Sequence, residues 1–104
     1  MKTEQIERIE AMETILDRAR EAVLSMDSAL SDFVEAQDQI EELDKYYSSG
    51  LWREDFEADE AGELPEDLKR GVLSEDAVYD LLTDNRDLIN DLLNVAEQYR
   101  FLID

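Results

Sequence analysis

Residues 3–47 read TEQIERIEAMETILDRAREAVLSMDSALSDFVEAQDQIEELDKYY, a stretch without glycine or proline. It is rich in Glu, Ala, Leu, Ile and Arg, which favour helices, so it contains no strong helix breaker. With Ile9 at heptad position a, apolar residues recur at positions a, d and g. At a and d they are Ile9, Met12, Leu16, Ala19, Val23, Met26, Leu30, Phe33 and Ile40. The stretch predicts one long amphipathic helix whose apolar face is wide enough for more than one neighbour.

A second apolar pattern lies in residues 74–103, where we expect a C-terminal helix. Its apolar residues follow helical spacings of three and four. They are Val78, Leu82, Ile89, Leu92, Ala96, Tyr99 and Ile103. Ser74 is the predicted N-cap, and Glu75 and Asp76 would lie in the first turn, where the helix dipole favours negative charge.

The connection between the two patterns, residues 48–73, holds all three glycines and the single proline of the chain. Pro65 suits the first position of a helix, and Gly71 suits a left-handed C-terminal cap. We therefore expect a structured connection with a short helix near residues 65–70.

Together these segments predict an all-α protein with a single helical domain over residues 1–104, in which the two long helices pack antiparallel as a hairpin or bundle. At about 1.5 Å per residue the helices would be about 65 and 45 Å long, so the first helix would extend beyond the second. The overhang is apolar and includes Ile6, Ile9, Met12, Ile15 and Leu16. Either the first helix breaks near residues 25–28 and folds back as a three-helix bundle, or two chains cover each other. Ser and Asp are weak breakers, which favours a homodimer.

The composition excludes several classes of chemistry. The chain has no cysteine and no histidine, so disulfides, thiolate nucleophiles, imidazole bases and Cys/His metal sites are absent. No pair of carboxylates stands out as a general acid and base. We therefore expect a protein that is not an enzyme and has no cofactor.

The charge also limits the partners. There are 29 Asp and Glu against 10 Lys and Arg, a net charge of −19, which repels nucleic acids and anionic lipids. We see no secretory signal and no apolar run of membrane-spanning length, so we expect a cytoplasmic protein without direct nucleic-acid or membrane binding.

The middle of the chain resembles a known family. The matching residues are Tyr46-Tyr47-Ser48-Ser49, Trp52, the run from Asp55 to Glu60, the run from Leu64 to Asp76, and Val78-Tyr79-Asp80-Leu81-Leu82. They resemble the small bacterial proteins grouped as domain of unknown function 4298. The rest of the chain is similar to that family in being helical and acidic. The resemblance implies no activity, no cofactor and no functional residues.

Aromatic and charged residues are numerous around this middle segment, and two interpretations remain open. In one, the aromatic side chains pack the end of the bundle. In the other, this end is a recognition surface, because Trp, Tyr and Arg often anchor interfaces. The candidate partner-binding residues are Tyr47, Trp52, Asp55, Asp59 and Arg70.

A calcium loop is an alternative interpretation of the acidic run. Carboxylates occupy positions 1, 3, 5, 9 and 12 of an EF-hand-like spacing, namely Asp55, Glu57, Asp59, Glu63 and Glu66. The run departs from an EF-hand because Glu60 stands at the turn glycine and Pro65 precedes the last ligand.

The function that the sequence favours is a non-catalytic protein–protein interaction module or assembly component, with a partner that has a basic surface. The alternative is an acidic mimic of nucleic acid that inhibits a DNA- or RNA-binding protein. The charge is spread along the whole chain, which favours the first interpretation.

Overall fold

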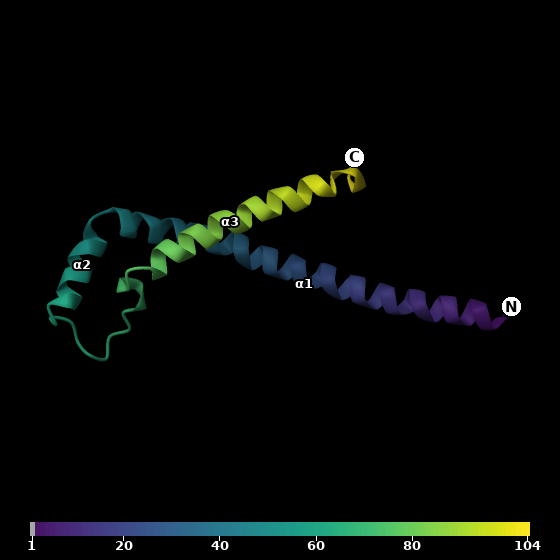
Figure 1. Cartoon of the computed structure of the whole chain (residues 1–104), viewed down its shortest axis with the longest axis horizontal. Coiled ribbons are helices and arrows are strands. Elements are labelled where there is room, and N and C mark those ends of the chain that lie inside the picture. Colours follow the sequence, from purple (N-terminus) through teal and green to yellow (C-terminus); the bar gives the residue numbers. More distant parts are fainter. Residues whose placement is uncertain (1) are drawn as a thin grey trace. The chain divides into compact units, whose positions relative to one another are not determined.

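The computed structural model describes residues 2–104, and every regular element among them is a helix (Figure 1). Three α-helices follow one another: α1 (Lys2–Ser48), α2 (Leu51–Glu60) and α3 (Ala77–Gln98). Two short 3₁₀ helices, η1 (Gly71–Leu73) and η2 (Arg100–Leu102), flank α3 in the sequence. The predicted all-α class is confirmed.

The chain divides into two units, of which one ends at Asp38 and the other runs from Gln39 to Asp104. The first unit consists of α1 alone. The second contains the last turns of α1, together with α2, η1, α3 and η2. Antiparallel packing of the two long helices and dimerisation remain predictions.

Helix α1 is continuous through residues 25–28 (Figure 1), so the predicted alternative of a break and fold-back at that point is wrong. Its observed bounds lie one residue outside the predicted range at each end. A helix of this length forms because every residue between Lys2 and Ser48 can adopt helical dihedral angles and none removes a backbone donor.

A glycine corner separates α1 from α2. Gly50 has a φ of 86°, a left-handed conformation that costs glycine little because it has no Cβ. The backbone N–H of Ser49 donates to the Tyr46 carbonyl at 3.3 Å, and the N–H of Glu54 donates to the Gly50 carbonyl at 3.1 Å. These bonds end one helix and begin the next within two residues.

Helix α2 lies within residues 48–73, which the sequence predicts to be a connection. The glycine that follows its last turn in a left-handed conformation is Gly62, whereas the prediction assigned such a cap to Gly71. Gly62 has a φ of 72°; its N–H donates to the Asp59 carbonyl, and the N–H of Glu63 donates to the Ala58 carbonyl, each at 3.0 Å. This pair of bonds is a Schellman motif.

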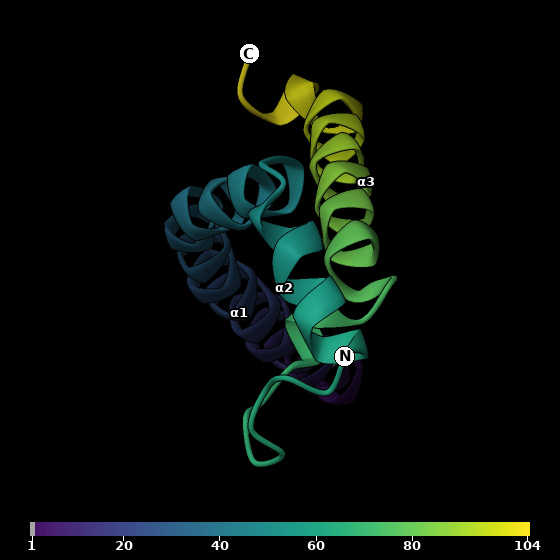
Figure 2. The same cartoon turned by 90° about the vertical axis from the view of Figure 1, so that its left-hand side faces the viewer.

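The prediction of a short helix near residues 65–70 is wrong. This segment is a loop between α2 and η1 (Figure 2), with a single turn in which the Leu68 N–H donates to the Pro65 carbonyl at 3.2 Å. Gly71 is not in the left-handed region, and it begins η1 instead of capping a helix. The Pro65 and Leu68 carbonyls accept bonds from the Arg70 side chain, which replaces helical pairing here.

Helix α3 is shorter than the predicted range of 74–103. The prediction of Ser74 as the N-cap is wrong, because α3 begins at Ala77 and its N-cap is Asp76, which makes no side-chain cap bond, so Glu75 and Asp76 lie before the helix. The Ser74 Oγ instead accepts a hydrogen bond from the Ala77 N–H at 3.2 Å in the turn that precedes α3. Regular α-helix ends at Gln98, and η2 follows. Leu73 and Val78 are the buried apolar residues of the part that the structure describes, so the core lies where η1 leads into α3.

Candidate functional site

Three rings form an aromatic cluster, which we define as Tyr47, Trp52 and Phe56. The Trp52 ring meets Tyr47 edge-on, with centroids 5.1 Å apart and an interplanar angle of 68°. It stacks on Phe56 at 5.1 Å and 17°. Trp52 and Phe56 share one face of α2 because they are four residues apart, and the Gly50 corner brings Tyr47 beside them.

The aromatic cluster also connects α2 to η1. The indole N–H of Trp52 donates to the Val72 carbonyl at 2.8 Å, across 20 residues of sequence. The three rings are half-buried. Trp52 therefore contributes apolar contact area and a hydrogen bond to the fold, and both would be lost in a truncated side chain.

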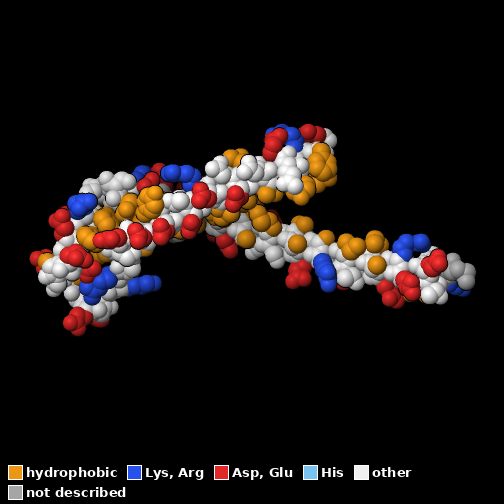
Figure 3. All heavy atoms as spheres, viewed as in Figure 1, with side chains coloured by type: hydrophobic (Ala, Val, Ile, Leu, Met, Phe, Trp, Pro, Cys, Tyr) orange, Lys and Arg blue, Asp and Glu red, His pale blue; other side chains and the backbone are white. Residues whose placement is uncertain are grey.

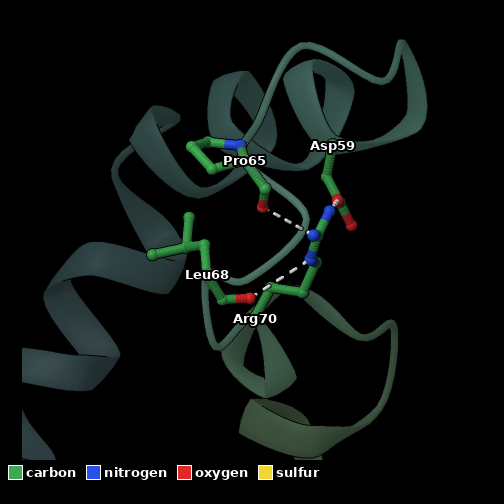
Figure 4. A network of polar contacts seen from close by, with 4 residues as sticks. All are labelled: Asp59, Pro65, Leu68 and Arg70. Atoms are coloured by element: carbon green, nitrogen blue, oxygen red, sulfur yellow. Dashed lines mark hydrogen bonds and ion pairs between the residues drawn. The ribbon is translucent and has the colours of Figure 1, made fainter.

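A second set of contacts, the Arg70 network, consists of Arg70 with Asp59, Pro65 and Leu68 (Figure 4). The Arg70 Nη1 lies 2.6 Å from the Asp59 Oδ1, and its Nη2 donates to the Pro65 carbonyl at 2.7 Å. The Nε makes a longer bond of 3.4 Å to the Leu68 carbonyl. The guanidinium thus uses its planar set of donors to hold the loop after α2 closed.

The ion pair of the Arg70 network is shielded from water more than the other ion pairs of the described residues. The side chains of Arg70 and Asp59 are 31% and 20% exposed, whereas those of Lys45 and Glu41 are 76% and 65% exposed. Less water around a pair means weaker screening of its attraction. We therefore expect the Arg70 pair to contribute more to stability than the Lys45 pair.

Tyr46 and Asp55 form a third contact. The Tyr46 hydroxyl donates to the Asp55 Oδ2 at 2.6 Å. Desolvation, this hydrogen bond and the negative charge of Asp55 raise the pKa of Tyr46 to about 12. The phenol is therefore protonated at neutral pH and acts as a hydrogen-bond donor that joins α1 to α2.

A surface hollow of about 300 Å³ lies beside this contact. Its lining residues are Tyr46, Asp55, Leu64, Leu68, Lys69, Val72 and Leu73. The walls are mainly aliphatic, and Asp55 already accepts the Tyr46 hydroxyl. The hollow therefore presents no pair of carboxylates that could work as acid and base.

The five predicted partner-binding residues all lie in the unit from Gln39 onward, and each contacts the protein itself. Tyr47 and Trp52 belong to the aromatic cluster, Asp59 and Arg70 to the Arg70 network, and Asp55 accepts the Tyr46 hydroxyl. These contacts favour the packing interpretation over the recognition one. The sequence interpretation missed Phe56 as a ring partner, although its spacing of four from Trp52 was a signal for it.

The backbone of residues 55–66 differs from that of an EF-hand loop. Asp55, Glu57 and Asp59 lie in α2, where successive residues turn by about 100° and carboxylates two apart diverge. Asp55 and Asp59 are also hydrogen-bonded to Tyr46 and Arg70. Within residues 2–104 no three acidic side chains converge in a way that could hold a metal ion.

A different surface lies on α1. We define the α1 stripe as Ile6, Ile9, Met12, Ile15, Leu16, Val23, Met26 and Leu30. These side chains are between 40% exposed, at Leu30, and 68% exposed, at Val23. Figure 3 shows apolar side chains recurring along one side of this helix. The stripe is a run of eight large apolar side chains on one helix, each at least 40% exposed.

None of the helices in residues 2–104 is both long and apolar enough to cross a membrane. The apolar residues of α1 are separated by charged ones, as an amphipathic surface requires. The stripe thus has the pattern of a helix that packs against another helix.

Comparison with known proteins identifies a family but no function. No curated protein and no solved structure matches the chain. The family model described as Domain of unknown function (DUF4298) matches residues 9–95, which include most of α1, all of α2 and the greater part of α3. The chain belongs to this family, domain of unknown function 4298.

Proposed function

We propose that this protein is a non-catalytic protein–protein interaction module, and that the α1 stripe is the surface that contacts its partner. One observation carries this proposal. Eight large apolar side chains at heptad spacing lie on α1 with at least 40% of their surface exposed. Contiguous apolar surface of this kind on a folded protein is typical of an interface.

The physical argument concerns the cost of leaving this surface in water. Each exposed Ile, Leu, Val or Met side chain would gain roughly 1.5–3 kcal/mol on full burial, and a partner helix supplies part of that gain. A helix as long as α1 also derives most of its stability from packing of its apolar face. A partner on the stripe would therefore stabilise α1 as well as bind it.

The rest of the chain supports a choice of partner by charge. From Gln39 onward there are 19 Asp and Glu against 6 Lys and Arg, a net charge of −13. A negative field of this size speeds association with a basic protein surface and disfavours an acidic one. The second unit therefore favours a basic surface on any protein that contacts it, whereas the α1 stripe needs only an apolar helix face opposite it.

The contacts of the second unit support a scaffold role. Its aromatic cluster and Arg70 network use side chains that elsewhere anchor partners, and here they hold the loop after α2 in place. The Tyr46 phenol, with a pKa of about 12, stays protonated beside Asp55. These groups are suited to keeping α2 and the loop after it folded, and the proposal therefore assigns recognition to the α1 stripe and not to them.

Affinity capture with matched variants tests the proposal. Leu16→Glu places a negative charge on the α1 stripe, and Thr14→Glu adds the same charge at heptad position f, on the opposite face. Tagged wild-type protein, Leu16→Glu and Thr14→Glu are compared at two salt concentrations, with bound proteins quantified by mass spectrometry. Circular dichroism checks that each variant is helical.

We expect the wild type and Thr14→Glu to retain the same bound protein, whether a second copy or a different chain, and Leu16→Glu to lose it. Equal retention by all three would contradict the role of the stripe. Capture of nucleic-acid enzymes only at low salt, independent of the stripe, would instead support the nucleic-acid mimic.

A further inference from the structure

We propose that the partner of the α1 stripe is the α1 stripe of a second copy of this chain, paired antiparallel about a two-fold axis between residues 17 and 18. This inference rests on the proposed function and names its partner. In an antiparallel pair of helices, position a of one helix faces position d of the other, so the heptad assignment specifies the possible registers.

The apolar layers of this pairing are complete near the axis. Ile9 lies opposite Met26 of the second copy, Met12 opposite Val23, and Leu16 opposite Ala19; each layer occurs twice by symmetry. The small side chain of Ala19 leaves room for Leu16. The paired region from residue 5 to residue 30 is about 39 Å long, which spans the whole α1 stripe.

Charge selects this register among its neighbours. In antiparallel pairs, position e flanks position e of the second helix. In the proposed register Glu13 lies beside Arg20 of the second copy on both sides of the axis, while Asp27 lies beside Ile6 and meets no charge. Both ion pairs form without burying an unpaired charge.

The adjacent registers bring like charges together. If the two α1 helices overlap over seven more residues, Glu13 lies beside Asp27 of the second copy and Arg20 lies beside Arg20 of the second copy. If they overlap over seven fewer residues, Glu13 lies beside Glu13 of the second copy. Like charges at such flanking positions destabilise a helix pair, so both alternatives are disfavoured.

Charge also selects the direction. A parallel pair would place Arg8 beside Glu13 of the second copy, so flanking charges alone do not exclude it. It would, however, bring together at one end two segments that begin at Gln39 and carry −13 each. The antiparallel pair separates the two Asp38 residues by about 60 Å along the axis. This distance is far beyond the screening length of about 8 Å at physiological salt.

Disulfide cross-linking tests direction and register, because the chain has no cysteine of its own. Met12→Cys and Val23→Cys are prepared separately, mixed, and oxidised. We expect a cross-link in the mixture and none in either variant alone. A parallel pair would cross-link Met12→Cys with itself, which would overturn the proposal. Met12→Cys mixed with Leu30→Cys is the control for the longer register, and preferential cross-linking of that mixture would also overturn it.

Charge reversal tests the ion pairs without cysteine. Sedimentation equilibrium should give the wild type a mass of twice 12.1 kDa. Arg20→Glu should raise the dimer dissociation constant about tenfold, because two attractive pairs become repulsive. The double variant Glu13→Arg/Arg20→Glu should restore it. In the longer register Glu13→Arg alone would tighten the dimer, since the introduced arginine would meet Asp27 of the second copy, and that result would overturn the proposal.

The failure of this inference differs from a failure of the proposed function. A wild-type protein that sediments as a monomer at micromolar concentrations overturns the self-pairing. In that case loss of capture by Leu16→Glu would still support the α1 stripe as an interface for a different protein. Capture that is unaffected by Leu16→Glu overturns the interface itself.

Discussion

The residues up to Asp38 and the segment from Tyr46 to Val72 use apolar and aromatic side chains in different ways. In the first unit the apolar residues follow a regular heptad, yet they remain exposed on α1. In that segment Tyr47, Trp52 and Arg70 follow no simple repeat, yet each contacts other side chains of the protein. In this protein a regular apolar spacing therefore indicates an exposed surface. The Trp, Tyr and Arg residues between the long helices, which are types common in interfaces, instead make contacts within the protein.

The largest expected effect comes from removing the centre of the aromatic cluster. Trp52→Ala deletes two ring contacts and the hydrogen bond to the Val72 carbonyl, so we expect a loss of about 2–3 kcal/mol in the free energy of unfolding. Urea denaturation followed by circular dichroism measures it. Trp52→Phe keeps the ring contacts and should lose only about 1 kcal/mol. Unchanged stability of Trp52→Ala together with lost partner capture would restore the recognition interpretation.

The Arg70 network should give the next largest effect. Arg70→Ala leaves Asp59 half-buried without its cation and frees the loop after α2, so we expect a loss of about 1–2 kcal/mol. Hydrogen exchange should rise at the amides of residues 61–70. Arg53→Ala is the matched control, because Arg53 is exposed on α2, and it should change stability by less than about 0.5 kcal/mol. Equal effects of the two substitutions would contradict the role of the network.

Alkaline pH should weaken the contact between Tyr46 and Asp55. The pKa of Tyr46 is raised from 10.0 to about 12 in the folded protein. A group with a raised pKa contributes its full stabilisation below the unfolded pKa and loses it as pH rises through the folded one. Stability should therefore fall between pH 10 and pH 12. The Tyr46→Phe variant, followed by the same denaturation, should show a smaller fall; an identical pH profile would contradict the assigned contact.

The smallest effect concerns the general charge. At a net charge of −19, like charges repel throughout the chain, and salt screens them. Raising sodium chloride at neutral pH should increase the melting temperature by a few degrees. A fall in melting temperature would mean that specific pairs, such as Arg70 with Asp59, outweigh the repulsion.

Helix α1 shows how much of this fold could be predicted from sequence. Its bounds and its continuity follow from an uninterrupted run of helix formers, because helical hydrogen bonds join residues only four apart. The start of α3 could be predicted less well: Ser74 bonds to the Ala77 N–H, but the N-cap is Asp76. The amphipathic face of α1 was also correct, since the position of a side chain around a helix depends only on its spacing.

Helix α2 and the loop after it show where prediction failed. Gly62 and Gly71 are equally able to adopt a left-handed conformation. Of these two only Gly62 does so, because the Schellman bonds that close α2 form there. Likewise Pro65 could begin a helix, but its carbonyl accepts the Arg70 guanidinium instead. Local rules permitted both outcomes and could not rank them.

The sequence by itself determined the helical class, the length of α1 and the amphipathic pattern of its side chains, because these depend on interactions between near neighbours along the chain. The tertiary structure alone decided which side chains meet in the second unit. The Trp52 indole reaches Val72 across 20 residues, and Arg70 reaches Asp59 across 11. Such contacts depend on how a loop closes in three dimensions, and the closure entropy that they offset is a property of the whole loop rather than of any residue.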